Sequence, residues 1–141
     1  WGSDRVYHHT APVNMNFGMR EALRLLADEG LDMAWARHRT NAEALWSGLE
    51  SMGIEMHVPE ELRLPTLTTV RIPEDVDGKA FTQHLLNNHG IEVGGGLGVL
   101  AGKIWRIGLM GYNSNPENVS RLLNLFETEL PQFRQNVAVA A

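Results

Sequence analysis

The sequence predicts an α+β fold in which a helical pair is followed by a small, mainly antiparallel sheet with helices on one face. Apolar residues keep helical spacing over about the first third of the chain, and the period then shortens to that of strands. The remaining segments alternate between strands and helices with short connections, in the order α-α-β-β-α-β-β-α. This order is typical of helices packed on one side of a sheet.

The helical pair is predicted over residues 14–53. The first helix ends at Gly30, because glycine readily adopts the left-handed conformation that closes a helix. The second helix begins near Asp32, a residue type favoured at helix starts, and ends at Gly53. The apolar positions expected to pack are Met15, Met19, Ala22, Leu23 and Leu26 in the first helix, and Trp35, Ala42, Leu45, Leu49 and Met52 in the second.

An α+β sandwich is predicted over residues 54–133. Each of its strands is short, alternates apolar with polar residues or is rich in β-branched residues, and is bounded by proline or glycine. The final helix has the clearest start, with Asn115 as N-cap and Pro116 at the favoured first position. The expected strands are residues 54–58, 66–72, 91–93 and 104–109, the helix between the second and third is residues 77–88, and the final helix buries Val119, Leu122, Leu123, Phe126 and Leu130.

Composition excludes several classes of protein. Lys and Arg number 12 against 17 Asp and Glu, and this net charge of −5 argues against a nucleic-acid partner. The chain has no cysteine, which excludes disulfides and cysteine-based zinc sites. No apolar run approaches the roughly 18–20 residues that a membrane span needs, so no membrane partner is expected.

Arg106 is the strongest candidate for a binding residue. Strand alternation places it opposite Trp105 and Ile107, whose large apolar side chains are expected in the core. Gly108 leaves space for a ligand to approach the sheet. An arginine in that position can bind a carboxylate through two parallel hydrogen bonds. The alternative is a solvated or purely structural arginine, and alternation alone favours that alternative.

Three other features offer weaker signals. The run Gly94-Gly95-Gly96-Leu97-Gly98 lacks the Gly-Lys-Ser/Thr of a phosphate loop, so it is interpreted as a flexible or tight-turning loop. The alternative is that this loop forms one wall of a site beside Arg106. Tyr7 and Thr10 offer two hydroxyls that suit an anionic oxygen, but without other information ordinary loop hydrogen bonding is favoured. His84 and His89 lie five residues apart on a predicted helix and are expected to diverge, so no metal site is expected.

Several motifs, taken together, point to a known family. They are Tyr7-His8-His9-Thr10-Ala11-Pro12-Val13, then Leu62-Arg63-Leu64-Pro65-Thr66 with Thr68-Thr69-Val70, and most specifically Gly95-Gly96-Leu97-Gly98 followed by Gly102-Lys103-Ile104-Trp105-Arg106-Ile107-Gly108-Leu109. This pattern closely resembles the alanine–glyoxylate (serine–pyruvate) aminotransferases, which are fold-type-I enzymes dependent on pyridoxal phosphate. The resemblance runs from Trp1 to about Phe133 and corresponds to the last third of such an enzyme.

The resemblance implies a homodimeric transaminase that moves an amino group from alanine or serine to glyoxylate or pyruvate. It implies that Arg106 binds the substrate carboxylate, and that Tyr7 and Thr10 reach across the dimer to the phosphate of the partner's pyridoxal phosphate. It also implies a C-terminal aminotransferase domain at residues 1–133, with an interface segment at 1–13, and a tail at 134–141.

The family's Schiff-base lysine has no counterpart in this chain. It precedes the Tyr-His-His-Thr segment in the family, and neither Lys79 nor Lys103 matches that position. We therefore expect a C-terminal portion that needs an N-terminal large domain and is inactive alone. The alternative is a free-standing, non-catalytic domain for carboxylate binding or dimerisation. The expected location is intracellular, in a peroxisome or mitochondrion if the source is eukaryotic and otherwise in the cytoplasm.

Overall fold

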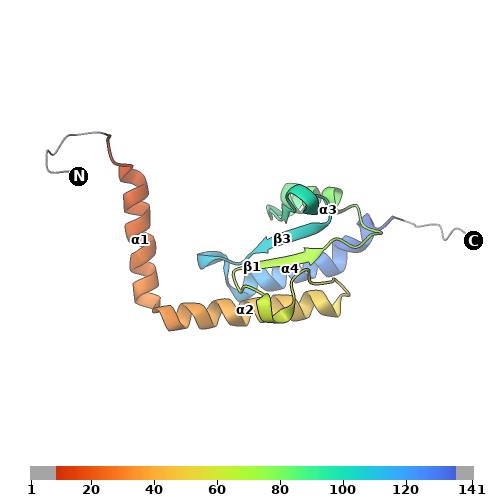
Figure 1. Cartoon of the computed structure of the whole chain (residues 1–141), viewed down its shortest axis with the longest axis horizontal. Helices are drawn as coiled ribbons and strands as arrows, with labels where there is room; N and C mark the ends of the chain where they lie inside the picture. Colours follow the sequence, from red (N-terminus) through yellow and green to blue (C-terminus); the bar gives the residue numbers. More distant parts are fainter. Residues whose placement is uncertain (1–8, 136–141) are drawn as a thin grey trace, which may run out of the picture. The chain divides into compact units, whose positions relative to one another are not determined.

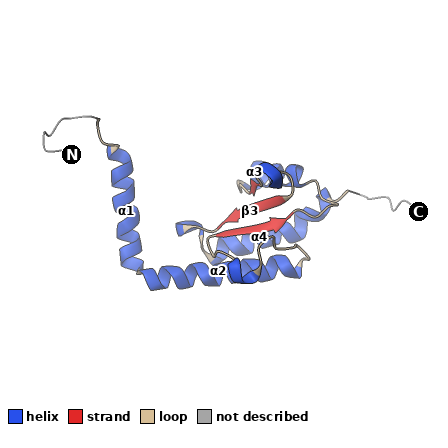
Figure 2. Ribbon diagram, viewed as in Figure 1, coloured by secondary structure: helices blue, strands red, loops and turns tan. Residues whose placement is uncertain are grey.

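The computed structural model describes residues 9–135, which form two compact units that divide between Trp35 and Ala36. Figures 1 and 2 show the order of the elements along the chain. None of the helices in the described residues is both long and apolar enough to cross a membrane. The predicted partition into residues 1–13, 14–53, 54–133 and a tail stays a prediction.

The first unit contains helix α1 (Val13–Glu29) and the start of α2 (Leu31–Ser51). As predicted, Gly30 ends α1, with a φ of 84° and its N–H bonded to the carbonyl of Leu26. No residue of α1 is buried in the described chain. Its large exposed apolar side chains are Val13, Met15, Phe17, Met19, Leu23 and Leu25.

The second unit is built on a three-stranded antiparallel sheet of β1 (Leu67–Arg71), β2 (Gly94–Gly95) and β3 (Ile104–Gly108). The strand order is β1-β3-β2, so β3 lies in the centre. The register pairs Val70 with Trp105 and Thr69 with Arg106, which places these two pairs on opposite faces.

Two predicted strands are wrong in extent. Residues 54–58 form only a single bridge, from Met56 to Val70, because Pro59 follows at once and cannot donate to a ladder. The strand expected at residues 91–93 lies instead at Gly94–Gly95. Glycine has low strand propensity, so the position of this strand depends on its pairing with Trp105 and Arg106 of β3.

Helices cover one face of the sheet, as the sequence predicts. α2, α3 (Gly78–His89) and α4 (Pro116–Glu129) all contribute to one core against the Val70–Trp105 face. Asp77 caps α3 by accepting from the N–H of Ala80, and Asn115 caps α4 in the same way. The largest fully buried side chains are Trp105, Phe81, Phe126, Leu45, Leu49, Ile54, Leu85 and Val70.

Short 3-10 helices complete the connections in the described part of the chain. The one at Gly111–Asn113 is tied to α2, because Ser114 accepts hydrogen bonds at its carbonyl from Arg37 and at its hydroxyl from Asn41. Ser114 is fully buried, so these bonds satisfy a polar residue within the unit. The 3-10 helices are Glu60–Leu62, Gly98–Leu100, Gly111–Asn113 and Leu130–Phe133.

Candidate functional site

Arg106 lies in the middle of the central strand and points to the face that the helices leave open. Its neighbours along β3, Trp105 and Ile107, are buried, whereas Arg106 is only partly buried. Its Nε donates a hydrogen bond of 2.7 Å to the carbonyl oxygen of Gly95. This hydrogen bond occupies one edge of the guanidinium. The predicted orientation of Arg106, opposite Trp105 and Ile107, is confirmed.

The other edge of the guanidinium remains available for a ligand. No acidic side chain among the described residues forms an ion pair with Arg106. Arg71, which lies on the same face, is by contrast paired with Glu55 at 2.9 Å. A planar guanidinium with two free terminal nitrogens matches a carboxylate, which accepts two parallel N–H bonds.

The glycine-rich stretch forms the wall beside Arg106. Gly94 pairs with Arg106 in the sheet, and a Cβ there would lie 3.5 Å from Nη2 of Arg106. Gly96 has no space for a side chain. Its N–H donates to the carbonyl of Ile104, and an added Cβ would lie 2.0 Å from the carbonyl oxygen of Leu100. The loop therefore folds back on itself only with glycine at position 96.

We expect Gly96→Ala to lower the free energy of unfolding by about 1–3 kcal/mol, the usual cost of forcing extra atoms into a packed site. The clash is with backbone, which cannot rotate away as a side chain can, so the neighbouring Gly95 carbonyl should also move. Chemical denaturation measures the change. Gly95→Ala is the matched control, since a Cβ there meets nothing within 4 Å. Equal stability of the two variants would contradict this account of the loop.

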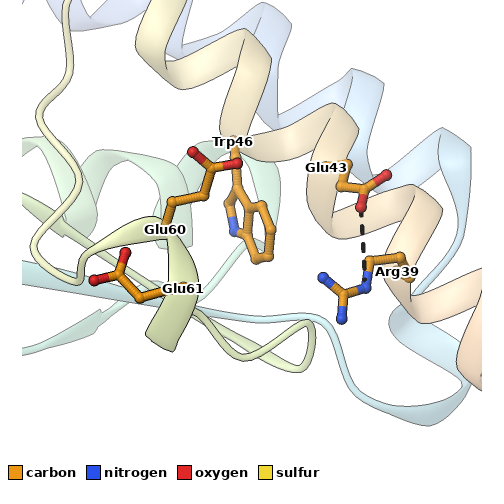
Figure 3. Close-up of a pocket in the computed structure, with 5 residues that line it drawn as sticks. All are labelled: Arg39, Glu43, Trp46, Glu60 and Glu61. Carbon is orange, nitrogen blue, oxygen red and sulfur yellow. Dashed lines mark ion pairs between the residues drawn. The ribbon is translucent and has the colours of Figure 1, made fainter.

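A separate shallow hollow lies against α2 and has a volume of about 430 Å³. Three carboxylates surround it, and its single cation, Arg39, is turned toward Glu43 at 3.9 Å (Figure 3). Its tryptophan bonds to Thr68, on the helix-covered face, so the hollow does not adjoin Arg106. An acidic lining does not suit a carboxylate ligand. The lining residues are Arg39, Glu43, Trp46, Glu60 and Glu61.

Comparison with known proteins identifies the family of this chain. Residues 2–122 match the family described as aminotransferase class-V. This chain belongs to that family. Among its relatives is the alanine–glyoxylate aminotransferase of Oryctolagus cuniculus, 41% identical over 140 residues, which cover 96% of this chain and 36% of that protein.

Solved structures of two aminotransferases share the fold. The alanine–glyoxylate aminotransferase of Nostoc sp. is 61% identical, with a TM-score of 0.84 over 90% of this chain and 34% of that one. The ureidoglycine–glyoxylate aminotransferase of Bacillus subtilis is 37% identical, with a TM-score of 0.88 over 99% of this chain and 36% of that one. The chain thus spans about a third of the length of these relatives, and the predicted family and fold type are confirmed.

The remaining site residues implied for a class-V aminotransferase are less fully described. Tyr7 lies outside the described residues. Thr10 is exposed, and it belongs to the first unit, whereas Arg106 belongs to the second. Lys79 lies in the first turn of α3 and Lys103 in the turn before β3. The roles of Tyr7, Thr10 and Arg106 stay predictions.

The family motif at residues 62–66 contains a structural residue whose role sequence reasoning missed. Arg63 is largely buried and pairs with Glu50 at 2.8 Å. Its Nε donates to the carbonyl of Val58, and its guanidinium lies over the ring of Trp46, 5.5 Å from the ring centre. Arg63 therefore joins the segment before β1 to α2. The proximity of Trp46 could not be found from sequence spacing.

A second polar cluster corrects the expectation that His84 and His89 diverge. Both rings hydrogen-bond to the carboxylate of Glu129, and the ring centres lie 5.5 Å apart. The hydrogen bond with His84 is the main cause that holds the pKa of Glu129 below its ordinary value. Helical spacing did not predict this contact because Glu129 comes from another helix, α4.

Proposed function

We propose that this chain is the C-terminal portion of a pyridoxal-phosphate-dependent aminotransferase that transfers an amino group from alanine or serine to glyoxylate or pyruvate. One observation carries the proposal. Arg106 is partly buried on the open sheet face, its Nε is held by the Gly95 carbonyl, and its terminal nitrogens have no carboxylate partner in the described chain. In this role Arg106 binds and orients the substrate α-carboxylate.

The names of the relatives support small carboxylate-bearing substrates. The rabbit and Nostoc proteins are named for alanine and glyoxylate, and the Bacillus protein is named for ureidoglycine and glyoxylate. The named amino donor differs among them, while the acceptor is shared. A guanidinium that binds a carboxylate fits this pattern, because glyoxylate, pyruvate, alanine and serine all carry a carboxylate.

The cofactor fits the residues of this chain only in part. Pyridoxal phosphate, when bound, supplies the electron-withdrawing ring that allows the amino group to be transferred. Thr10 is an exposed residue, and we assign its hydroxyl and that of Tyr7 to the cofactor phosphate, both across a dimer interface. The cofactor lysine would come from an N-terminal large domain, since neither Lys79 nor Lys103 matches its family position.

Dependence on a larger assembly is consistent with the surface of α1. Its apolar side chains from Val13 to Leu25 are exposed in the described chain, and contiguous apolar surface commonly marks an interface. We propose that the large domain and a second copy of the enzyme cover it. We further propose that the enzyme acts in a peroxisome or mitochondrion of a eukaryote, or otherwise in the cytoplasm.

The visible absorbance of the full-length gene product with pyridoxal phosphate tests this function. We expect a band from the lysine-bound cofactor, and we expect alanine to abolish it as the cofactor takes up the amino group. Glyoxylate should then restore the band. If no band forms and the gene encodes only these residues, the transaminase proposal fails in favour of a carboxylate-binding or dimerisation domain.

A further inference from the structure

The carboxyl ends of α3 and α4 bring two imidazoles and one carboxylate together at the surface. His89 is the last residue of α3, and Glu129 is the last residue of α4. Five residues along a helix correspond to about 140° of rotation, so His84 and His89 would not share a ligand on an isolated helix. Glu129, from α4, hydrogen-bonds to both rings. One ligand atom from each residue lies within 4.8 Å of the other two.

We propose that His84, His89 and Glu129 form a binding site for a divalent cation of the zinc class. Two imidazole nitrogens and one carboxylate oxygen are a ligand set that Zn²⁺ accepts at about 2.0–2.2 Å, with water in the fourth position. Such bond lengths place ligand atoms about 3.3 Å apart in a tetrahedron. The three ligand atoms already lie within 4.8 Å of one another, so side-chain rotations would bring them to that spacing without a change in the backbone.

The surroundings favour a cation at this point. Two helices end here, and the carboxyl end of a helix carries a partial negative charge. The three side chains keep 20–26% of their surface exposed, so an ion can enter from solvent without unfolding. The positive charge of Arg121 would repel a bound cation. Its guanidinium, however, donates a hydrogen bond of 2.6 Å to the carbonyl oxygen of His89.

Asn88 controls which nitrogen of His84 can bind a metal. Its side-chain amide lies 2.7 Å from Nδ1 of His84, one turn away on α3. With the amide nitrogen donating to Nδ1, the ring proton is on Nε2 and points at Glu129. Rotation of the amide by half a turn would let its oxygen accept a proton from Nδ1, which frees the Nε2 lone pair for the cation. Ligating histidines are commonly held by such an acceptor.

Zinc titration of the metal-free, full-length protein tests the site. We expect one Zn²⁺ per chain by calorimetry and a rise in melting temperature that a chelator reverses. His89→Gln and Glu129→Gln should each weaken affinity at least about tenfold, in line with losses seen even for residues that only support a ligand. His57→Gln is the matched control, because it removes one histidine away from the cluster.

The Asn88→Asp variant distinguishes a metal-binding site from a cluster that only forms hydrogen bonds. The carboxylate can only accept from Nδ1 of His84, so it should raise zinc affinity by about tenfold. Cobalt(II) bound in place of zinc should show visible bands that are lost in His89→Gln. The proposal is overturned if zinc binds with the same affinity to the native, His89→Gln and Asn88→Asp proteins, or does not bind. Circular dichroism confirms that each variant is folded.

Discussion

Replacing Arg106 by alanine is expected to cost the full-length enzyme about 2–5 kcal/mol in kcat/KM for alanine, the usual range for deleting one partner of a buried charge pair. At 1.4 kcal/mol per decade this exceeds a tenfold loss. The physical reason is that the substrate carboxylate would lose its bidentate partner in a partly desolvated site. Steady-state kinetics with alanine and glyoxylate measure the effect, and the absorbance of the bound cofactor should survive the change.

Two further variants test whether the loss of kcat/KM in Arg106→Ala comes from the loss of carboxylate binding. Arg71→Ala removes an arginine from the same sheet face, but its pair with Glu55 is exposed and contributes at most about 1 kcal/mol, so kcat/KM should not change. Arg106→Lys keeps the charge but not the bidentate geometry, and should give an intermediate rate. If Arg106→Ala has the same kcat/KM as Arg71→Ala, Arg106 is a structural residue and the carboxylate assignment is wrong.

Replacing Phe81 by alanine is expected to lower the free energy of unfolding by about 3–5 kcal/mol. Phe81 is fully buried at the centre of an aromatic cluster. Its ring centre lies 5.1 Å from that of Phe126 and 5.5 Å from those of Trp105 and Phe133. Truncation would remove these contacts and leave a cavity that rigid rings cannot fill. Chemical denaturation followed by tryptophan fluorescence measures the loss, since Trp105 reports on the same core.

Leu86→Ala provides the control on the same helix. Leu86 is 44% exposed, so its truncation creates no enclosed cavity and should cost much less. Phe81→Leu restores part of the volume and should recover part of the stability. Equal costs for Phe81→Ala and Leu86→Ala would show that the aromatic cluster does not dominate the stability of this unit.

The elements with strong local signals were predictable from the sequence. α4 begins as expected because Asn115 and Pro116 act within one turn, through a side-chain acceptor and a preset φ. The alternation of Trp105, Arg106 and Ile107 likewise placed Arg106 on the open face, because strand periodicity is local. The short strands were harder to predict. A two-residue strand of glycines has no periodicity, and its position depends on the strand it pairs with.

The sequence by itself determined the class of fold, the helix limits at Gly30 and Asn115, and the family to which the motifs point. Those features follow from neighbours in the chain and from patterns held over many residues. Only the tertiary structure decided that the Gly95 carbonyl accepts a hydrogen bond from Arg106, and that Glu129 hydrogen-bonds to both His84 and His89. The physical reason is the same in both cases. Each contact joins segments whose approach is set by packing of the core, and no spacing along the chain encodes that distance.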